Sequence, residues 1–218
     1  MTKRRKKVSS AKRRKKSTPK STPGVGTITD KIQYYLEGAF DSVATSRKQH
    51  YEANPGERPT KQDVDDLIHK CANTNALIAG AANLIPGPWG ALAILPEITM
   101  VIRNQIRLIY DLGVAHGKES KLTAELLLGV FATVSGGGAI SLATVRGGQL
   151  LVRRASLRVM QQIIEWLGGK IAQRILKAFV AKWFPVVGAA AMALWARQST
   201  IQLGEKATKM LRREIVVE

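Results

Sequence analysis

Two long stretches of this 218-residue chain, residues 72–96 and 126–145, carry no charged side chain and are interrupted near their centres by helix-breaking residues. The interruptions are Pro86, Gly87 and Pro88, followed by Trp89, in the first stretch, and Gly136, Gly137 and Gly138 in the second. Inside a helix, proline costs about 3 kcal/mol and glycine about 1 kcal/mol relative to alanine. Each stretch is therefore predicted to form two short apolar helices joined by a turn. Such hairpins either pack against each other or insert shallowly into lipid.

Apolar residues recur at helical spacing before the first stretch. One helix is predicted to begin at Thr27, where Asp30 has capping-box spacing, and to end near Asn54. A second is predicted to begin at Thr60, with Asp63 at the same spacing, and to run into the first uncharged stretch.

A third helix is predicted to restart at Pro96, because proline is tolerated in a first helical turn. It should end at Gly117. Arg107 and Asp111 are four residues apart on its predicted exposed face, where they can form an ion pair.

Residues 149–181 are predicted to form a basic amphipathic helix, and a last helix follows Pro185 and Gly188 and runs to Leu211. The amphipathic helix has an apolar stripe made of Leu150, Leu157, Met160, Ile164, Leu167, Ile171, Ile175 and Phe179. No segment has the sustained alternation of a β-strand. The predicted fold class is all-α, a compact bundle of about six or seven helices that forms a single domain over residues 27–218.

The net charge of +18 is concentrated at the N-terminus and in the C-terminal half. Residues 1–26 are predicted to form a disordered basic tail, because like charges repel and almost no apolar residues are present to fold around. The tail residues expected to bind an anionic surface are Lys3, Arg4, Arg5, Lys6, Lys7, Lys12, Arg13, Arg14, Lys15 and Lys16. The alternatives are non-specific binding of nucleic acid and a solvated tail that only aids solubility.

Few residues are candidates for catalysis. The segment from Gly113 to Ser120 resembles a phosphate-binding loop, but its glycine spacing is one residue too short. Ser135 precedes the three glycines without the pattern of a nucleophile elbow, and His116 is a candidate general base that is better explained as a helix cap. Asp63, Asp65 and Asp66 are explained by an acidic first helical turn. We therefore predict no enzymatic activity, no cofactor, no metal site and no small-molecule substrate.

Three stretches together resemble the EcsC family of bacterial membrane-associated proteins. They are residues 79–96, the segment from Asn104-Gln105 to His116-Gly117, and residues 184–190, followed by Trp195, Thr200, Gly204 and Ala207. The resemblance covers roughly residues 60–212. Glu97 and His116 depart from it, because the family pattern has an aspartate and an aromatic residue there. The resemblance implies association with a membrane.

These observations predict a non-enzymatic protein at the cytoplasmic face of the bacterial membrane, peripheral or shallowly inserted. It would be accessory to transport, secretion or membrane organisation. Trp166 and Trp183 of the basic amphipathic helix would lie at the membrane interface. The alternative is a soluble, cytoplasmic helical domain whose basic tail binds nucleic acid non-specifically. A protein partner is not identified by the sequence. The least favoured alternative is an enzyme acting on lipid-like substrates in a pocket lined by the glycine-rich turns.

Overall fold

The computed structural model describes the backbone of residues 25–84, 87–137, 142–181 and 185–217. It describes the side chains of residues 28–82, 84, 95–137, 142–173 and 189–217. The basic residues of the tail, together with Pro86 and Gly138, lie outside the described residues.

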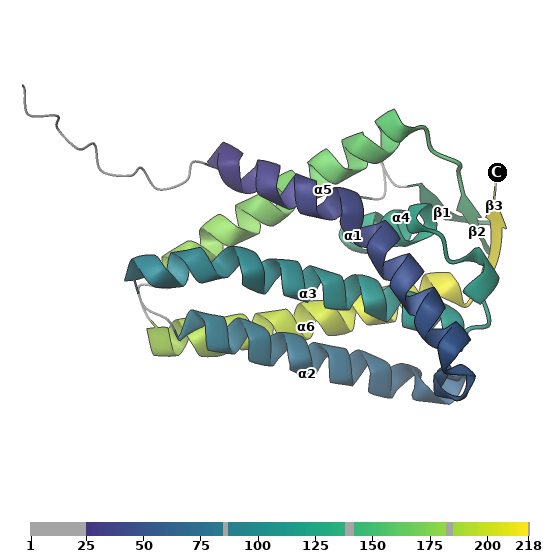
Figure 1. Cartoon of the computed structure of the whole chain (residues 1–218), viewed down its shortest axis with the longest axis horizontal. Helices are drawn as coiled ribbons and strands as arrows, with labels where there is room; N and C mark the ends of the chain where they lie inside the picture. Colours follow the sequence, from purple (N-terminus) through teal and green to yellow (C-terminus); the bar gives the residue numbers. More distant parts are fainter. Residues whose placement is uncertain (1–24, 85–86, 138–141, 182–184, 218) are drawn as a thin grey trace, which may run out of the picture.

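The described part of the chain is mostly helical, which confirms the all-α prediction (Figure 1). The helices are α1 (Val25–Ala53), α2 (Val64–Asn83), α3 (Gly87–Ala115), α4 (Ala124–Val134), α5 (Leu157–Ala181) and α6 (Pro185–Leu211). Short 3-10 turns, η1 (Pro55–Glu57), η2 (Lys61–Asp63) and η3 (Glu119–Lys121), lie between α1 and α4. The predicted capping box is confirmed before α2, where Thr60 and Asp63 cap each other. Helix α1 begins at Val25, two residues before Thr27.

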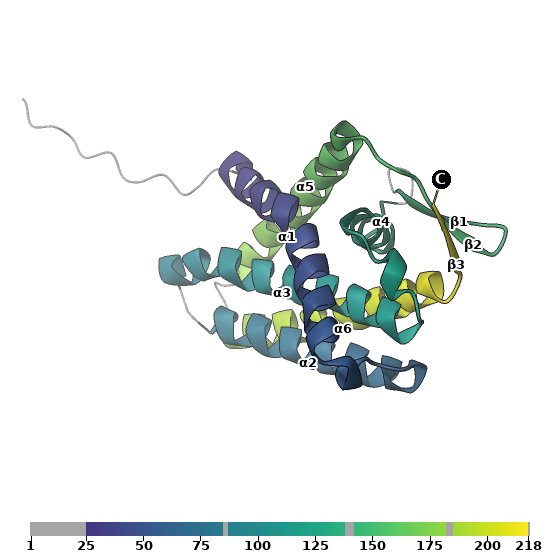
Figure 2. The same ribbon diagram turned by 45° about the vertical axis from the view of Figure 1, so that its right-hand side comes forward.

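Helix α2 packs along both α3 and α6, and α1 crosses α3 and reaches α5 (Figures 1 and 2). Helix α4 lies inside this arrangement, and eight of its eleven residues are buried. Its Phe131 ring meets the Phe40 ring of α1 edge-on, with 5.7 Å between the ring centroids. The uncharged sequence of residues 126–134 in α4 is therefore explained by its place in the core.

The prediction that Pro96 restarts a helix is wrong, because Pro96 lies inside α3. The helix already begins at Gly87, so Pro88 occupies the first turn, where its missing N–H is not needed. Only residues 84–86 separate α2 from α3, and the two helices pack side by side as the first predicted hairpin requires.

The second predicted hairpin is wrong in its second half. Residues 143–146 form strand β1 (Ala143–Arg146), and residues 149–152, predicted as helix, form strand β2 (Gln149–Val152). These strands pair antiparallel, and β3 (Glu214–Val217) pairs parallel to β2 (Figure 2). Gly147 and Gly148 have φ values of 57° and 84° and form the tight turn between β1 and β2. Strands of four residues are too short to give a sustained alternation.

The amphipathic segment starts as helix α5 at Leu157, eight residues later than predicted. Of its stripe, Ile164, Leu167 and Ile171 are buried in the core, whereas Leu157 is exposed. Most of the described part of this stripe therefore packs against protein. Ile175 and Phe179 lie outside the described side chains.

Candidate functional site

One end of the bundle is built from uncharged helical segments. The C-terminal end of α2 and the N-terminal ends of α3 and α6 lie together there, as both views show (Figures 1 and 2). These segments are residues 72–83, 87–96 and 185–196. We call them the apolar end. Three of the predicted hairpin residues, Gly87, Pro88 and Trp89, form the first turn of α3, and Pro185 and Gly188 form the first turn of α6.

Large apolar side chains are exposed at this end. Leu77 and Leu84 are 74% and 60% exposed, and Leu194 and Trp195 of α6 are 68% and 45% exposed. Met100 of α3, four residues beyond the apolar end, is exposed as well. Exposed apolar side chains that gather in one region of a protein are typical of an interaction surface.

A partly open pocket of about 240 Å³ lies between α3, α4, α5 and α6. Its walls are mainly apolar and include Ile102, Phe131, Leu167 and Leu203. Trp195 also lines it, so the pocket opens beside one of the exposed residues of the apolar end. The polar side chains of the pocket come from the buried Glu97 and Gln105, and from Ser135, Lys170, Ser199, Gln202 and Lys206.

The glycine-rich turn after α4 forms one edge of this pocket. Gly136 has a φ of 94°, and a Cβ atom there would come within 2.8 Å of Lys170 Nζ. A Cβ atom on Gly137 would come within 2.7 Å of the Trp166 ring. Lys170 donates a hydrogen bond to the Ser135 carbonyl and lies 4.6 Å from the centroid of the Trp166 ring. These glycines therefore permit the close approach of α5, and Trp166 is partly buried with Lys170 over its ring.

A buried polar network adjoins the pocket at the interface of α2, α3 and α6. The Asn75 amide and the Gln105 amide each donate to Thr200 Oγ1, both at 3.1 Å, and Asn104 donates to the Asn75 Oδ1 atom at 2.9 Å. Asn75 and Thr200 are completely buried. Asn104, Gln105 and Thr200 are among the residues that carry the family resemblance, and the fold brings them together. Asn75 had no signal in the sequence beyond its place in an uncharged helix.

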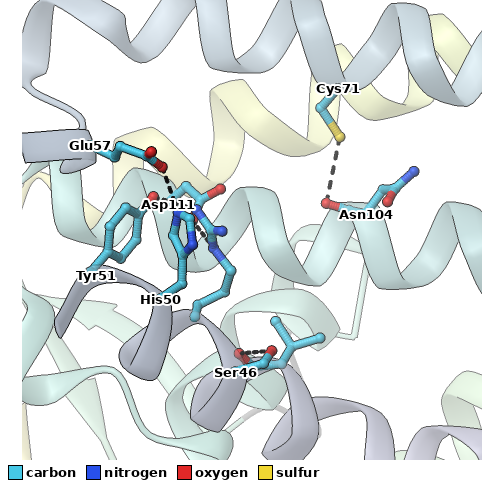
Figure 3. Close-up of polar contacts among 9 residues, drawn as sticks. Ser46, His50, Tyr51, Glu57, Cys71, Asn104 and Asp111 are labelled. Carbon is cyan, nitrogen blue, oxygen red and sulfur yellow. Dashed lines mark hydrogen bonds and ion pairs between the residues drawn. The ribbon is translucent and has the colours of Figure 1, made fainter. Parts of the chain in front are cut away.

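Cys71 borders this network and donates from Sγ to the Asn104 carbonyl at 3.5 Å (Figure 3). Burial raises the pKa of the Cys71 thiol to about 12, with a further contribution from Asp111. A thiol with this pKa stays protonated near neutral pH, so Cys71 is a structural residue and not an activated nucleophile.

A second polar cluster joins α1 to α3. Arg47 Nε donates to Asp111 Oδ1 at 2.8 Å, and the Tyr51 hydroxyl donates to the same oxygen at 3.0 Å. The predicted pair of Arg107 with Asp111 is wrong, because Asp111 faces the interior and is held by α1 (Figure 3). Burial raises the pKa of Tyr51, so its phenol remains a hydrogen-bond donor. Next to it, His50 pairs with Glu57 at 2.9 Å.

The remaining candidates stay apart. Asp63 accepts hydrogen bonds from Thr60 in the capping box before α2, and Asp66 pairs with Lys70 at 2.7 Å, so the acidic residues serve the helix. Ser135 lies at the pocket edge, whereas His116 lies beyond the end of α3 in a different pocket. Within the described residues, the pocket lined by Trp195 contains no histidine or cysteine, and no cluster of histidine, cysteine or acidic residues fits a metal ion. This pocket can enclose an apolar group beside cationic, amide and carboxylate side chains.

Comparison with family models, with curated proteins and with solved structures gives no match for this chain. The resemblance to the EcsC family therefore stays a prediction.

Proposed function

We propose that this chain is a non-enzymatic peripheral membrane protein of the bacterial cytoplasmic face, similar to the EcsC family. It is accessory to transport, secretion or membrane organisation. The apolar end of the bundle enters an anionic bilayer to a shallow depth, and the basic tail binds lipid headgroups.

The observation that carries the proposal is the exposure of Leu77, Leu84, Leu194 and Trp195 at one end of the bundle. Burying a leucine side chain is worth about 1.5–3 kcal/mol, so several such side chains favour transfer into lipid. Tryptophan prefers the interfacial depth of a bilayer. Among the described residues, no helix has an apolar run of the length needed to cross a membrane.

The tail adds a second and physically different attraction. Residues 1–20 carry 11 basic side chains and no acidic ones. A lysine or arginine near an anionic surface contributes about 1 kcal/mol. Exposed charges are screened over about 8–10 Å at physiological ionic strength, so this contribution weakens with salt, whereas insertion of the apolar end does not.

Flotation with phosphatidylglycerol vesicles tests the proposal. Leu194→Asp should lower the partition coefficient of the protein onto the vesicles about tenfold or more. The matched control is Leu157→Asp, because Leu157 is 79% exposed but lies at the start of α5, away from the apolar end. Equal binding of the two variants at high salt would exclude insertion of the apolar end.

Deleting residues 1–20 should reduce flotation at low salt only. If nuclease treatment, and not vesicle composition, controls the sedimentation of the full chain, the alternative of a helical domain with a nucleic-acid-binding tail is the better interpretation. This outcome and the Leu194 result are independent, so each half of the proposal can fail separately.

The pocket beside Trp195 supports the same proposal, because an acyl chain fits its apolar walls and an anionic headgroup fits Lys170 and Lys206. Val101 lines this pocket, so Val101→Trp should fill it and abolish the adduct with lysophosphatidylglycerol in native mass spectrometry. Val159→Trp on α5 changes a residue outside the lining and is the control. Retention of the adduct in both variants would place the lipid elsewhere.

A further inference from the structure

A second pocket lies at the opposite end of the bundle from the apolar end. Four side chains from three chain segments line it: Lys61 of η2, His116 and Lys118 of the turn after α3, and Arg212 directly after α6. We call it the basic pocket. Because α3 has 29 residues, and a helix rises about 1.5 Å per residue, the pocket lies roughly 40 Å from the start of α3 at the apolar end.

The charges in the basic pocket have no counterion in the part of the chain that the structure describes. Within the described residues, none of Lys61, Lys118 and Arg212 has a carboxylate oxygen within 4.0 Å. The acidic side chains adjacent in sequence are already engaged. Asp63 accepts the hydrogen bonds of Thr60, and Glu119 pairs with Arg58 at 2.9 Å. Three cations of like sign that converge without a partner repel one another, and this repulsion is relieved when an anion binds between them.

His116 supplies an independent observation. Its Nε2 atom is buried and has no hydrogen-bond partner. Burial lowers the pKa of His116, and Arg212, Lys61 and Lys118 lower it further. An imidazole beside three cations is disfavoured as a cation, and a bound anion would reverse this effect.

We propose that the basic pocket is a binding site for a phosphate group, with Lys61, Lys118 and Arg212 as the ligands of a dianionic phosphomonoester. Arginine offers a planar pair of donors for two phosphate oxygens, and lysine supplies point charges. The site is independent of the proposed membrane function. Its distance from the apolar end favours a water-soluble phosphate compound over a lipid headgroup.

NMR titration of the histidines in the full-length chain tests the site. Sulfate is the first probe, because its charge is constant near neutral pH, and inorganic phosphate is the second. The chain has three histidines, and its basic tail contains none. The tail therefore adds no histidine signal of its own, and His50 and His69 are internal references. Saturating sulfate should raise the pKa of His116 by about one unit and leave the other two histidines nearly unchanged.

Arg212→Gln and Lys61→Gln should each weaken sulfate binding about tenfold, because each removes a charge-assisted hydrogen bond. Lys209→Gln is the matched control, since Lys209 is exposed on the last turn of α6 and does not line the pocket. Equal affinity in all three variants, or a pKa of His116 that does not respond to either anion, would overturn the proposal.

Dihexanoyl phosphatidic acid, a soluble lipid with a phosphomonoester headgroup, distinguishes the two sources of the phosphate. Binding no tighter than that of inorganic phosphate supports a soluble ligand. Binding at least about tenfold tighter, and lost in Arg212→Gln, supports a lipid headgroup in the same site.

Discussion

Arg47 and Asp111 are 64 residues apart in the chain and form a buried ion pair, with 2.8 Å between Arg47 Nε and Asp111 Oδ1. The guanidinium also donates from Nη2 to the Tyr51 hydroxyl at 2.6 Å and lies 4.5 Å from the centroid of the Tyr51 ring. Tyr51 in turn stacks on Tyr110. This cluster fixes the crossing of α1 over α3.

Removing one partner of this pair should destabilise the protein strongly. Arg47→Met leaves Asp111 buried without a counterion, and such a loss costs about 3–5 kcal/mol. The control is Lys48→Met, because Lys48 is exposed and pairs only loosely with Glu52, so that its loss costs less than about 1 kcal/mol. Urea unfolding followed by circular dichroism measures both. Similar midpoints for the two variants would mean that the buried pair contributes little.

Loss of the Thr200 hydroxyl from the buried polar network should destabilise the protein. Thr200→Val leaves the amide donors of Asn75 and Gln105 without their acceptor, which costs about 1–3 kcal/mol. Thr74→Val removes an exposed hydroxyl that bonds only the Lys70 carbonyl, and it should change the free energy of unfolding by less than about 0.5 kcal/mol. Denaturant titration measures the free energy of unfolding of both variants. An unchanged stability of Thr200→Val would mean that these hydrogen bonds contribute little.

Two glycine substitutions should change the stability of the protein in opposite directions. A Cβ atom on Gly204 would lie 2.7 Å from Ile68 Cγ1, so Gly204→Ala should force α6 away from α2 and cost about 1–3 kcal/mol. Gly38 lies in α1 with no atom within 4 Å of an added Cβ, so Gly38→Ala should stabilise the helix by roughly 0.5–1 kcal/mol. Thermal unfolding should give a lower Tm for the first variant and a higher Tm for the second. A rise in both would show that α2 and α6 are not in close contact at Gly204.

Cys71 should react slowly with alkylating reagents, and the reaction rate should keep rising with pH through pH 10. Burial raises the pKa of this thiol to about 12, so the thiolate fraction grows about tenfold for each pH unit through pH 10. An ordinary thiol would level off above a pKa of about 8.5. Iodoacetamide labelling in native buffer and in urea, followed by mass spectrometry, measures the difference. A native rate that levels off below pH 9 would mean that Cys71 is more exposed than its contacts indicate.

Several helix ends follow from local sequence. Thr60 and Asp63 cap each other within four residues, and Gly117 ends α3 with a φ of 70°, so each signal is contained in one turn of chain. The all-α class follows for the same reason, because helical periodicity repeats within each segment. Pro96 was assigned wrongly because a proline in sequence is compatible both with a helix start and with an exposed position inside a long helix. Packing along α2 and α6 decided between them.

The candidate sites depended on the tertiary structure. The sequence by itself determined the uncharged stretches, the basic tail and the separate motifs around Asn104 and Thr200. It did not determine that Asp111 faces Arg47, that β2 pairs with β3 from the chain end, or that Arg212 lies beside His116. Each of these contacts joins residues more than 60 positions apart. Hydrophobic periodicity records which face of a segment is buried, but not which distant segment buries it, so only the folded arrangement of the helices brings these charges together.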